Sequence, residues 1–155
     1  MDDIFFEARR RTLRIILVLS IIGSGFSLFG NLLTGLAFPT LKMMYETGAM
    51  TFPEEMTIFM ERIFSIPRPY FLCSALLYGI SLAGVIMMWN LKKSGFHLYT
   101  IAQLLVLLVT TLFLGREYVA LGDIMFTLLF VVFYYISLRN LGVFHKATEE
   151  GESAE

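Results

Sequence analysis

The sequence predicts an all-α fold: an integral membrane four-helix bundle with a short amphipathic helix in its longest loop. Of its 155 residues, 57% are hydrophobic and 16% are charged. Soluble domains are usually near half apolar and about a quarter charged. The sequence also contains four apolar runs that are long enough to cross a bilayer, which takes about 20 residues per helix. Both observations favour a membrane protein.

The predicted spans cover residues 15–38, 70–91, 96–114 and 119–138 of a single domain at 1–148. The acidic tail at 149–155 is expected to be disordered. The first apolar run exceeds the roughly 7–15 residues of a signal-peptide core, so we interpret it as an uncleaved span. The fourth run contains Asp123. Without that residue the run is too short for the hydrocarbon core, so Asp123 is expected at one interface.

The distribution of Lys and Arg predicts the orientation of the spans, because cytoplasmic loops are enriched in these residues. Eight lie on one side of the predicted spans: Arg9, Arg10, Arg11, Arg14, Lys92, Lys93, Arg139 and Lys146. Four lie on the other side: Lys42, Arg62, Arg68 and Arg116. Both termini are therefore expected to be cytoplasmic. The segment at 39–69 is expected outside.

Two connections have recognisable patterns. The segment Trp89–Tyr99 is predicted to be a tight cytoplasmic turn, with Gly95 able to break the helix and with interfacial aromatic residues at both ends. In the outer loop, Thr51 and Glu54 have the spacing of a capping box and predict a helix from about Pro53 to Phe64. Its apolar residues repeat at helical spacing, so we expect it to pack as a lid: Met56, Phe59, Met60 and Ile63.

Polar residues form a stripe with alternating steps of four and three on each of two spans. The first span carries Ser20, Ser24, Ser27, Asn31 and Thr34, and the fourth carries Asp123, Thr127, Phe130, Tyr134 and Ser137. Because these spans run in opposite directions, Asn31 and Thr34 are expected at the depth of Asp123 and Thr127, and Ser20 and Ser24 at the depth of Tyr134 and Ser137. The seam is either ordinary packing, held by interhelical hydrogen bonds, or the wall of a polar solute path.

Three further features add candidate residues. Gln103 lies inside the third span, where its amide needs a partner. Asp123 is either a helix cap or ion-pair partner, or a proton or cation site. Ala75, Gly79 and Ala83 are four residues apart, the pattern of a close helix contact, either within the chain or between subunits. The candidate solute or ion site therefore comprises Asn31, Thr34, Asp123, Thr127 and Gln103.

Several classes of function lack support in the sequence. No phosphate-binding loop, zinc-protease helix or nucleophile–base set is recognisable, so no catalytic residue, metal site or cofactor is predicted. The net charge of −1 argues against a nucleic-acid partner. The single cysteine, Cys73, is expected to be a small buried apolar residue. The expected partners are the lipid bilayer and either another membrane protein or further copies of the chain.

The segment Gly84–Tyr99, with the sequence GVIMMWNLKKSGFHLY, resembles a turn of small four-helix inner-membrane proteins of bacteria. The resemblance implies a four-helix architecture and a location in a bacterial inner membrane. It implies no activity and no site residues. From the sequence, the leading hypothesis is a non-enzymatic structural or accessory membrane protein. A small transporter or channel that uses the polar seam is the alternative, and a membrane enzyme ranks third.

Overall fold

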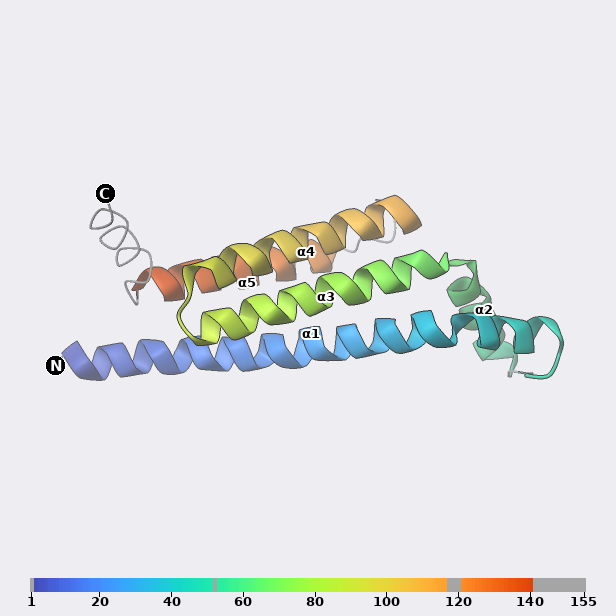
Figure 1. The fold of residues 1–155 in the computed structure, drawn as a ribbon, viewed down its shortest axis with the longest axis horizontal. Coiled ribbons are helices and arrows are strands. Elements are labelled where there is room, and N and C mark those ends of the chain that lie inside the picture. Colours follow the sequence, from blue (N-terminus) through green and yellow to red (C-terminus); the bar gives the residue numbers. More distant parts are fainter. Residues whose placement is uncertain (1, 52, 117–120, 141–155) are drawn as a thin grey trace.

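The computed structural model describes residues 2–51, 53–116 and 121–140. These residues form five helices and no strands, which confirms the all-α class (Figure 1). The helices are α1 (Asp2–Glu46), α2 (Glu54–Ser65), α3 (Arg68–Trp89), α4 (Lys93–Leu114) and α5 (Leu121–Asn140). The predicted tail at 149–155 and the first two residues of the predicted fourth span, 119–120, lie outside the described residues.

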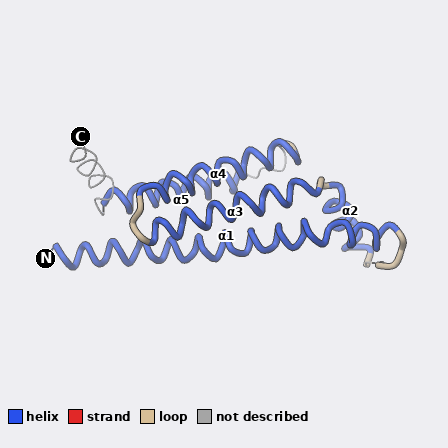
Figure 2. Tube along the Cα trace, viewed as in Figure 1, coloured by secondary structure: helices blue, strands red, loops and turns tan. Residues whose placement is uncertain are grey.

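The long helices α1, α3 and α4 lie side by side, and α5 packs behind them (Figure 1). Helix α3 lies in the middle and contacts α1 and α4 along much of its length, whereas α5 contacts α1 and α4 less extensively. The loops between the helices are short (Figure 2). We call the end with the start of α1, the α3–α4 turn and the end of α5 the turn end. The end with α2 is the lid end.

Within the described part of the chain, three helices are long and apolar enough to cross a membrane: residues Arg10–Glu46 of α1, and the whole of α3 and α4. Helix α5 contributes a shorter apolar stretch, Ile124–Asn140. Many large apolar side chains on these helices are exposed, including Phe26 at 77% and Leu112 at 71%. Such surfaces are expected where lipid, rather than water, surrounds the helices.

Helix α1 extends past both limits of the predicted span at 15–38, and it continues through Pro39 to Glu46. Proline has no backbone N–H, so the carbonyl of residue i−4, Gly35, loses its helical hydrogen bond. The Nε atom of Arg68 donates to this oxygen at 2.9 Å. The expectation of a loop from residue 39 was therefore wrong for residues 39–46, which are helical, because a side chain from α3 satisfies the carbonyl that Pro39 leaves open.

A helix is present at the predicted position as α2, shifted by one residue. Its expected packing face was partly wrong, because Met56 and Phe59 are exposed and only Met60 and Ile63 are partly buried. The capping box was wrong: the N-cap residue is Pro53, and it makes no side-chain capping bond. Contacts with the end of α1 hold α2 in place instead. The Phe64 ring lies 6.0 Å from the Phe38 ring and 5.2 Å from the Tyr45 ring, between centroids. The Tyr45 hydroxyl donates to Glu61 Oε1 at 3.2 Å.

The α3–α4 turn is tighter than expected and does not use Gly95. The left-handed residue is Leu91, with φ of 56°. The N–H groups of Leu91 and Lys92 donate to the carbonyls of Met88 and Met87, the Schellman pattern of a helix end. Leu91 also packs against the core, which offsets the conformational cost of a non-glycine residue there. Gly95 lies within α4 and is buried, so the expectation that it breaks the helix was wrong.

The main core lies towards the turn end and joins α1, α3, α4 and α5. Its buried residues are Leu13, Leu17, Val85, Met88, Tyr99, Tyr134 and Leu138. Among the described residues of α5, only Tyr134 and Leu138 are buried, and both lie in its last two turns. Helix α5 is thus anchored at the turn end, and none of its described residues nearer the lid end is buried.

Candidate functional site: a buried polar network

A network of polar side chains crosses the turn-end half of the molecule. Its first branch joins α1 to α5. The Tyr134 hydroxyl lies 2.5 Å from Ser20 Oγ and 3.2 Å from the Ile16 carbonyl oxygen. Tyr134 is fully buried and Ser20 nearly so. These contacts satisfy both hydroxyls where no water is expected, which stabilises the α1–α5 contact.

The second branch joins α1, α3 and α4 through Ser81. Gln103 Nε2 donates to Ser81 Oγ at 2.9 Å, and Ser81 Oγ lies 3.3 Å from Ser24 Oγ. Ser81 has no exposed surface, and Ser24 is nearly buried. Gln103 thus has the internal partner that its position inside an apolar helix requires. Chemically, this branch is a set of neutral hydrogen bonds between adjacent helices.

Aromatic rings surround the first branch. The rings of Tyr99 and Tyr134 meet edge to face with centroids 5.1 Å apart, and the Phe130 ring lies 6.3 Å from Tyr134. Edge-to-face geometry is favourable for aromatic pairs. The Tyr134 ring therefore packs between α4 and its own helix while its hydroxyl reaches α1.

Towards the lid end, the polar residues of α1 bond within their own helix. Asn31 Nδ2 donates to the Ser27 carbonyl at 2.8 Å, and Thr34 Oγ1 donates to the Gly30 carbonyl at 2.8 Å. Both side chains are partly buried. Such local bonds satisfy a polar group without a second helix.

The pairing of Ser20 with Tyr134 defines the antiparallel register of α1 and α5. Stepping seven residues along each helix, from 20 to 27 and from 134 to 127, places Thr127 at the depth of Ser27. Thr127 is partly buried. Asp123 lies within α5, but its side chain is outside the described residues. The cap, ion-pair and ion-site hypotheses for Asp123 therefore stay predictions.

Among the described residues, two buried hydroxyl groups have no hydrogen-bond partner: Ser74 Oγ on α3 and Thr100 Oγ1 on α4. Ser74 is 1% exposed and lies one heptad before Ser81. An unmade bond at a buried polar group costs about 1–3 kcal/mol.

The stripe of small residues on α3 does not form the closest helix contact. Ala75 is buried, but Gly79 is only partly buried and Ala83 is exposed. All three line an open apolar groove of about 430 Å³ beside α1. The closest approach lies elsewhere, where Gly84 of α3 faces Gly95 of α4.

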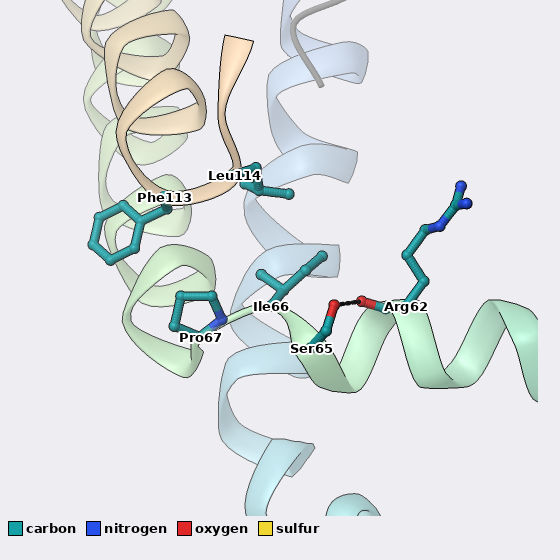
Figure 3. A pocket seen from close by; sticks show the side chains of 6 residues that line it. All are labelled: Arg62, Ser65, Ile66, Pro67, Phe113 and Leu114. Carbon is teal, nitrogen blue, oxygen red and sulfur yellow. Dashed lines mark hydrogen bonds between the residues drawn. The ribbon is translucent and has the colours of Figure 1, made fainter. Parts of the chain in front are cut away.

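A pocket of about 120 Å³ at the lid end lies between the α2–α3 connection and the end of α4 (Figure 3). Its lining includes Ile66, Pro67, Phe113 and Leu114. The Arg62 side chain extends away from Phe113, and Ser65 Oγ donates to the Arg62 carbonyl at 2.7 Å. No charged group points into this pocket from the residues that Figure 3 labels.

Cys73, expected to be buried, is exposed, because it faces outward from α3. Over the described ranges, no three side chains of His, Cys, Asp or Glu come together as a possible metal site.

The sequence analysis identified Ser20, Ser24, Tyr134 and Gln103 but missed Ser81 and Tyr99. A spacing signal for Ser81 exists: Ser74, Ser81 and Met88 are seven residues apart and all are buried.

No family model, curated protein or solved structure matches the chain.

Proposed function

We propose that the chain is a four-span integral membrane protein in which α1, α3, α4 and α5 form a bundle. The length and hydropathy of α1, α3 and α4 support three spans. Helix α5 supports the fourth, since it packs against α1 and α4 and carries Arg139 in its last turn, at the turn end. The orientation follows from the Lys and Arg bias, with the turn end and both termini in the cytoplasm. The resemblance at Gly84–Tyr99 favours a bacterial inner membrane.

Within that membrane, the proposed role is non-enzymatic, as a structural or accessory protein. The observation that carries this role is the polar network, in which side chains from neighbouring helices bond to each other. Ser81 lies between Ser24 and Gln103, and Tyr134 lies against Ser20. Polar groups that are paired in this way hold neighbouring helices together.

An accessory role requires a stable companion, which is another membrane protein or a second copy of the chain. A tagged chain extracted in mild detergent is expected to co-elute with a stoichiometric companion. The matched control is Ser81→Ala together with Gln103→Leu, which loosens the network and should weaken the assembly. The accessory role would be contradicted if the chain elutes as a monomer and if brief crosslinking in intact membranes does not change its elution profile.

A small transporter or channel is the second candidate. The unpartnered hydroxyl of Ser74 and the absence of buried residues in the lid-end half of α5, over its described residues, favour it. In this reading, Asn31 and Thr127 line a polar path, with Asp123 as the titratable group.

Water access to the seam separates the two candidates. Single cysteines replace Thr127 and Phe130 in a Cys73→Ala background and are treated with a small polar maleimide from outside. If the seam is packed, neither cysteine should be labelled more than a control cysteine that replaces the buried Tyr134. Labelling of both would favour the transporter and contradict a purely structural seam.

A further inference from the structure

We propose that the turn end of α1 binds an anionic phospholipid, with Arg11 and Arg14 holding its phosphate. The apolar residues Ile15, Val18 and Leu19 would contact one acyl chain. This inference rests on the proposed membrane insertion and assigns the bound lipid to the cytoplasmic leaflet.

The first observation is the shape and order of the site. Five residues of α1 line one groove of about 270 Å³: Arg11, Arg14, Ile15, Val18 and Leu19. Their spacing of i, i+3, i+4, i+7 and i+8 places them on one helical face. The two guanidinium groups belong to the end of this face nearer the terminus, and the apolar residues follow towards the middle. A phospholipid presents its phosphate and acyl chain in the same order.

The second observation is that, among the residues whose side chains the structure describes, neither guanidinium group forms an ion pair with a carboxylate. Lys42–Glu46 is the one ion pair recorded among the described residues, and it lies at the other end of α1. Glu7 precedes Arg11 by four residues but makes no ion pair with it. Guanidinium groups bind phosphate through two parallel hydrogen bonds, which makes a phosphate a suitable counter-charge.

The third observation is that Arg14 is held in place from outside its own helix. Its Cζ atom lies 6.0 Å from the centre of the Trp89 ring, at the end of α3. A cation–π contact of this kind restrains the side chain beside the groove. Tryptophan also favours the membrane interface, which places the guanidinium at the depth of lipid headgroups.

The surrounding charge favours an anionic lipid over a zwitterionic one. Arg10, Lys92, Lys93 and Arg139 lie at the same end of the molecule and are all exposed. Each basic residue near an anionic membrane surface adds a favourable increment to binding. A purely apolar partner helix would instead desolvate two guanidinium groups without a counter-charge, which is costly. The occupant must therefore carry both an anion and an apolar chain.

The test compares lipids that have the same acyl chains and different headgroups. The purified full chain in detergent is titrated with phosphatidylglycerol or phosphatidylcholine, and bound lipid is counted by native mass spectrometry. The wild-type chain should prefer phosphatidylglycerol. The Arg11→Gln/Arg14→Gln variant should lose about tenfold in apparent affinity for it. The control, Arg10→Gln/Lys92→Gln, removes the same charge outside the groove and should lose less than threefold.

Two further arms identify the source of the phosphate and the part played by the groove. Glycerol phosphate without acyl chains should not compete at lipid-equivalent concentrations, since it makes no contact with the apolar residues. Ile15→Ala/Leu19→Ala should weaken binding of the long-chain lipid while keeping the preference for phosphatidylglycerol. Equal losses in the groove and control variants, or full competition by glycerol phosphate, would overturn the inference.

Membrane insertion is measured separately, as the fraction of each variant that resists alkaline extraction from membranes. If the wild-type chain does not insert into membranes, the proposed function is contradicted. A chain that inserts but binds both lipids equally would overturn this inference alone.

Discussion

Arg68 and Pro39 act as a pair. Proline at position 39 leaves the Gly35 carbonyl without its helical donor, and the Arg68 guanidinium supplies a replacement at 2.9 Å. The bond connects the start of α3 to the last part of α1. It also explains why a proline lies inside a helix of 45 residues. Proline alone predicts a helix end, because the arginine that compensates for it lies in a different helix.

This pairing predicts a specific non-additivity. Arg68→Ala should lower the free energy of unfolding in detergent by about 1.5–3 kcal/mol, the value of a hydrogen bond to a charged group. In a Pro39→Ala background the same change should cost under about 0.5 kcal/mol, because an alanine at this position donates its own N–H to the Gly35 carbonyl. Thermal unfolding of the two single variants and the double variant measures the coupling.

The control for this cycle is Arg62→Ala, an exposed cation at the same end whose guanidinium extends away from the other residues labelled in Figure 3. It should be neutral in both backgrounds. If Arg68→Ala lowers the free energy of unfolding by the same amount with and without Pro39, the hydrogen bond to the Gly35 carbonyl does not cause the loss of stability.

Single residues also mark the limit of prediction from sequence. The need of Gln103 for a partner follows from an amide inside an apolar helix, and the structure supplies Ser81. The hydroxyl that Gln103 contacts depends on how α3 is rotated about its axis relative to α4. Hydropathy does not specify this rotation. The turn shows the same limit: Gly95 is the residue that sequence rules favour for a left-handed position, but Leu91 occupies it.

Among the elements, α3 and α4 form the closest pair. The contact depends on Gly84 and Gly95. A Cβ atom on Gly95 would lie 2.6 Å from the Gly84 carbonyl oxygen and 2.7 Å from the Met88 nitrogen. Both are backbone atoms, so the clash cannot be relieved by a side-chain rotation. The helices would have to separate along the hairpin.

Gly95→Ala is therefore expected to destabilise the protein by about 1–3 kcal/mol or more, the cost of overpacking a tight interface. Gly84→Ala should do the same, since its Cβ would lie 2.7 Å from the Tyr99 nitrogen. Gly23→Ala is the matched control, because nothing lies within 4 Å of its Cβ position. It should be neutral or stabilising by up to about 1 kcal/mol. Denaturation midpoints in one detergent compare the three variants, and a Gly95→Ala chain as stable as Gly23→Ala would contradict the close contact.

The helices were more predictable than their ends. Three apolar runs identified α1, α3 and α4 because a span must contain about 20 apolar residues. The limits of α1 were missed because residues outside an apolar run can still be helical, and composition does not show where such a helix stops. The capping box failed for a local reason: Pro53, rather than Thr51, precedes the first residue of α2.

At the scale of the whole molecule, the helices are held together unequally. The core joins all four long helices at the turn end, whereas in the lid-end half the described buried residues belong to α1, α3 and α4 but not to α5, as Phe38, Phe71 and Val106 show. The polar network lies in the better-packed half. The predicted seam between α1 and α5 is thus a firm contact at Ser20 and Tyr134. Its lid-end part, at Asn31 and Asp123, stays a prediction because the side chain of Asp123 is not described.

The arrangement of the long helices gives the topology a sharp test. Helices α1, α3, α4 and α5 alternate in direction, so the start of α1, the end of α5 and the α3–α4 turn share one end (Figure 1). The sequence assigns eight of the twelve Lys and Arg residues of the chain to this side. Reporter fusions after Lys93 and at the C-terminus should both be active in the cytoplasm. A fusion after Ala49 should be active outside.

The physical cause of that orientation can be tested with the same fusions. One variant replaces five basic residues of the turn end by Gln: Arg10, Arg11, Arg14, Lys92 and Lys93. Three basic residues then remain on the side of the turn end, and the four on the side of the lid end outnumber them. If the charge bias determines the orientation, the Ala49 fusion of this variant should gain cytoplasmic activity. Neutralising Lys42 and Arg62 at the lid end is the opposite control and should strengthen the original orientation. A cytoplasmic signal at Ala49 in the unmodified chain would overturn the proposed topology, and with it the placement of Arg11 and Arg14 against the inner leaflet.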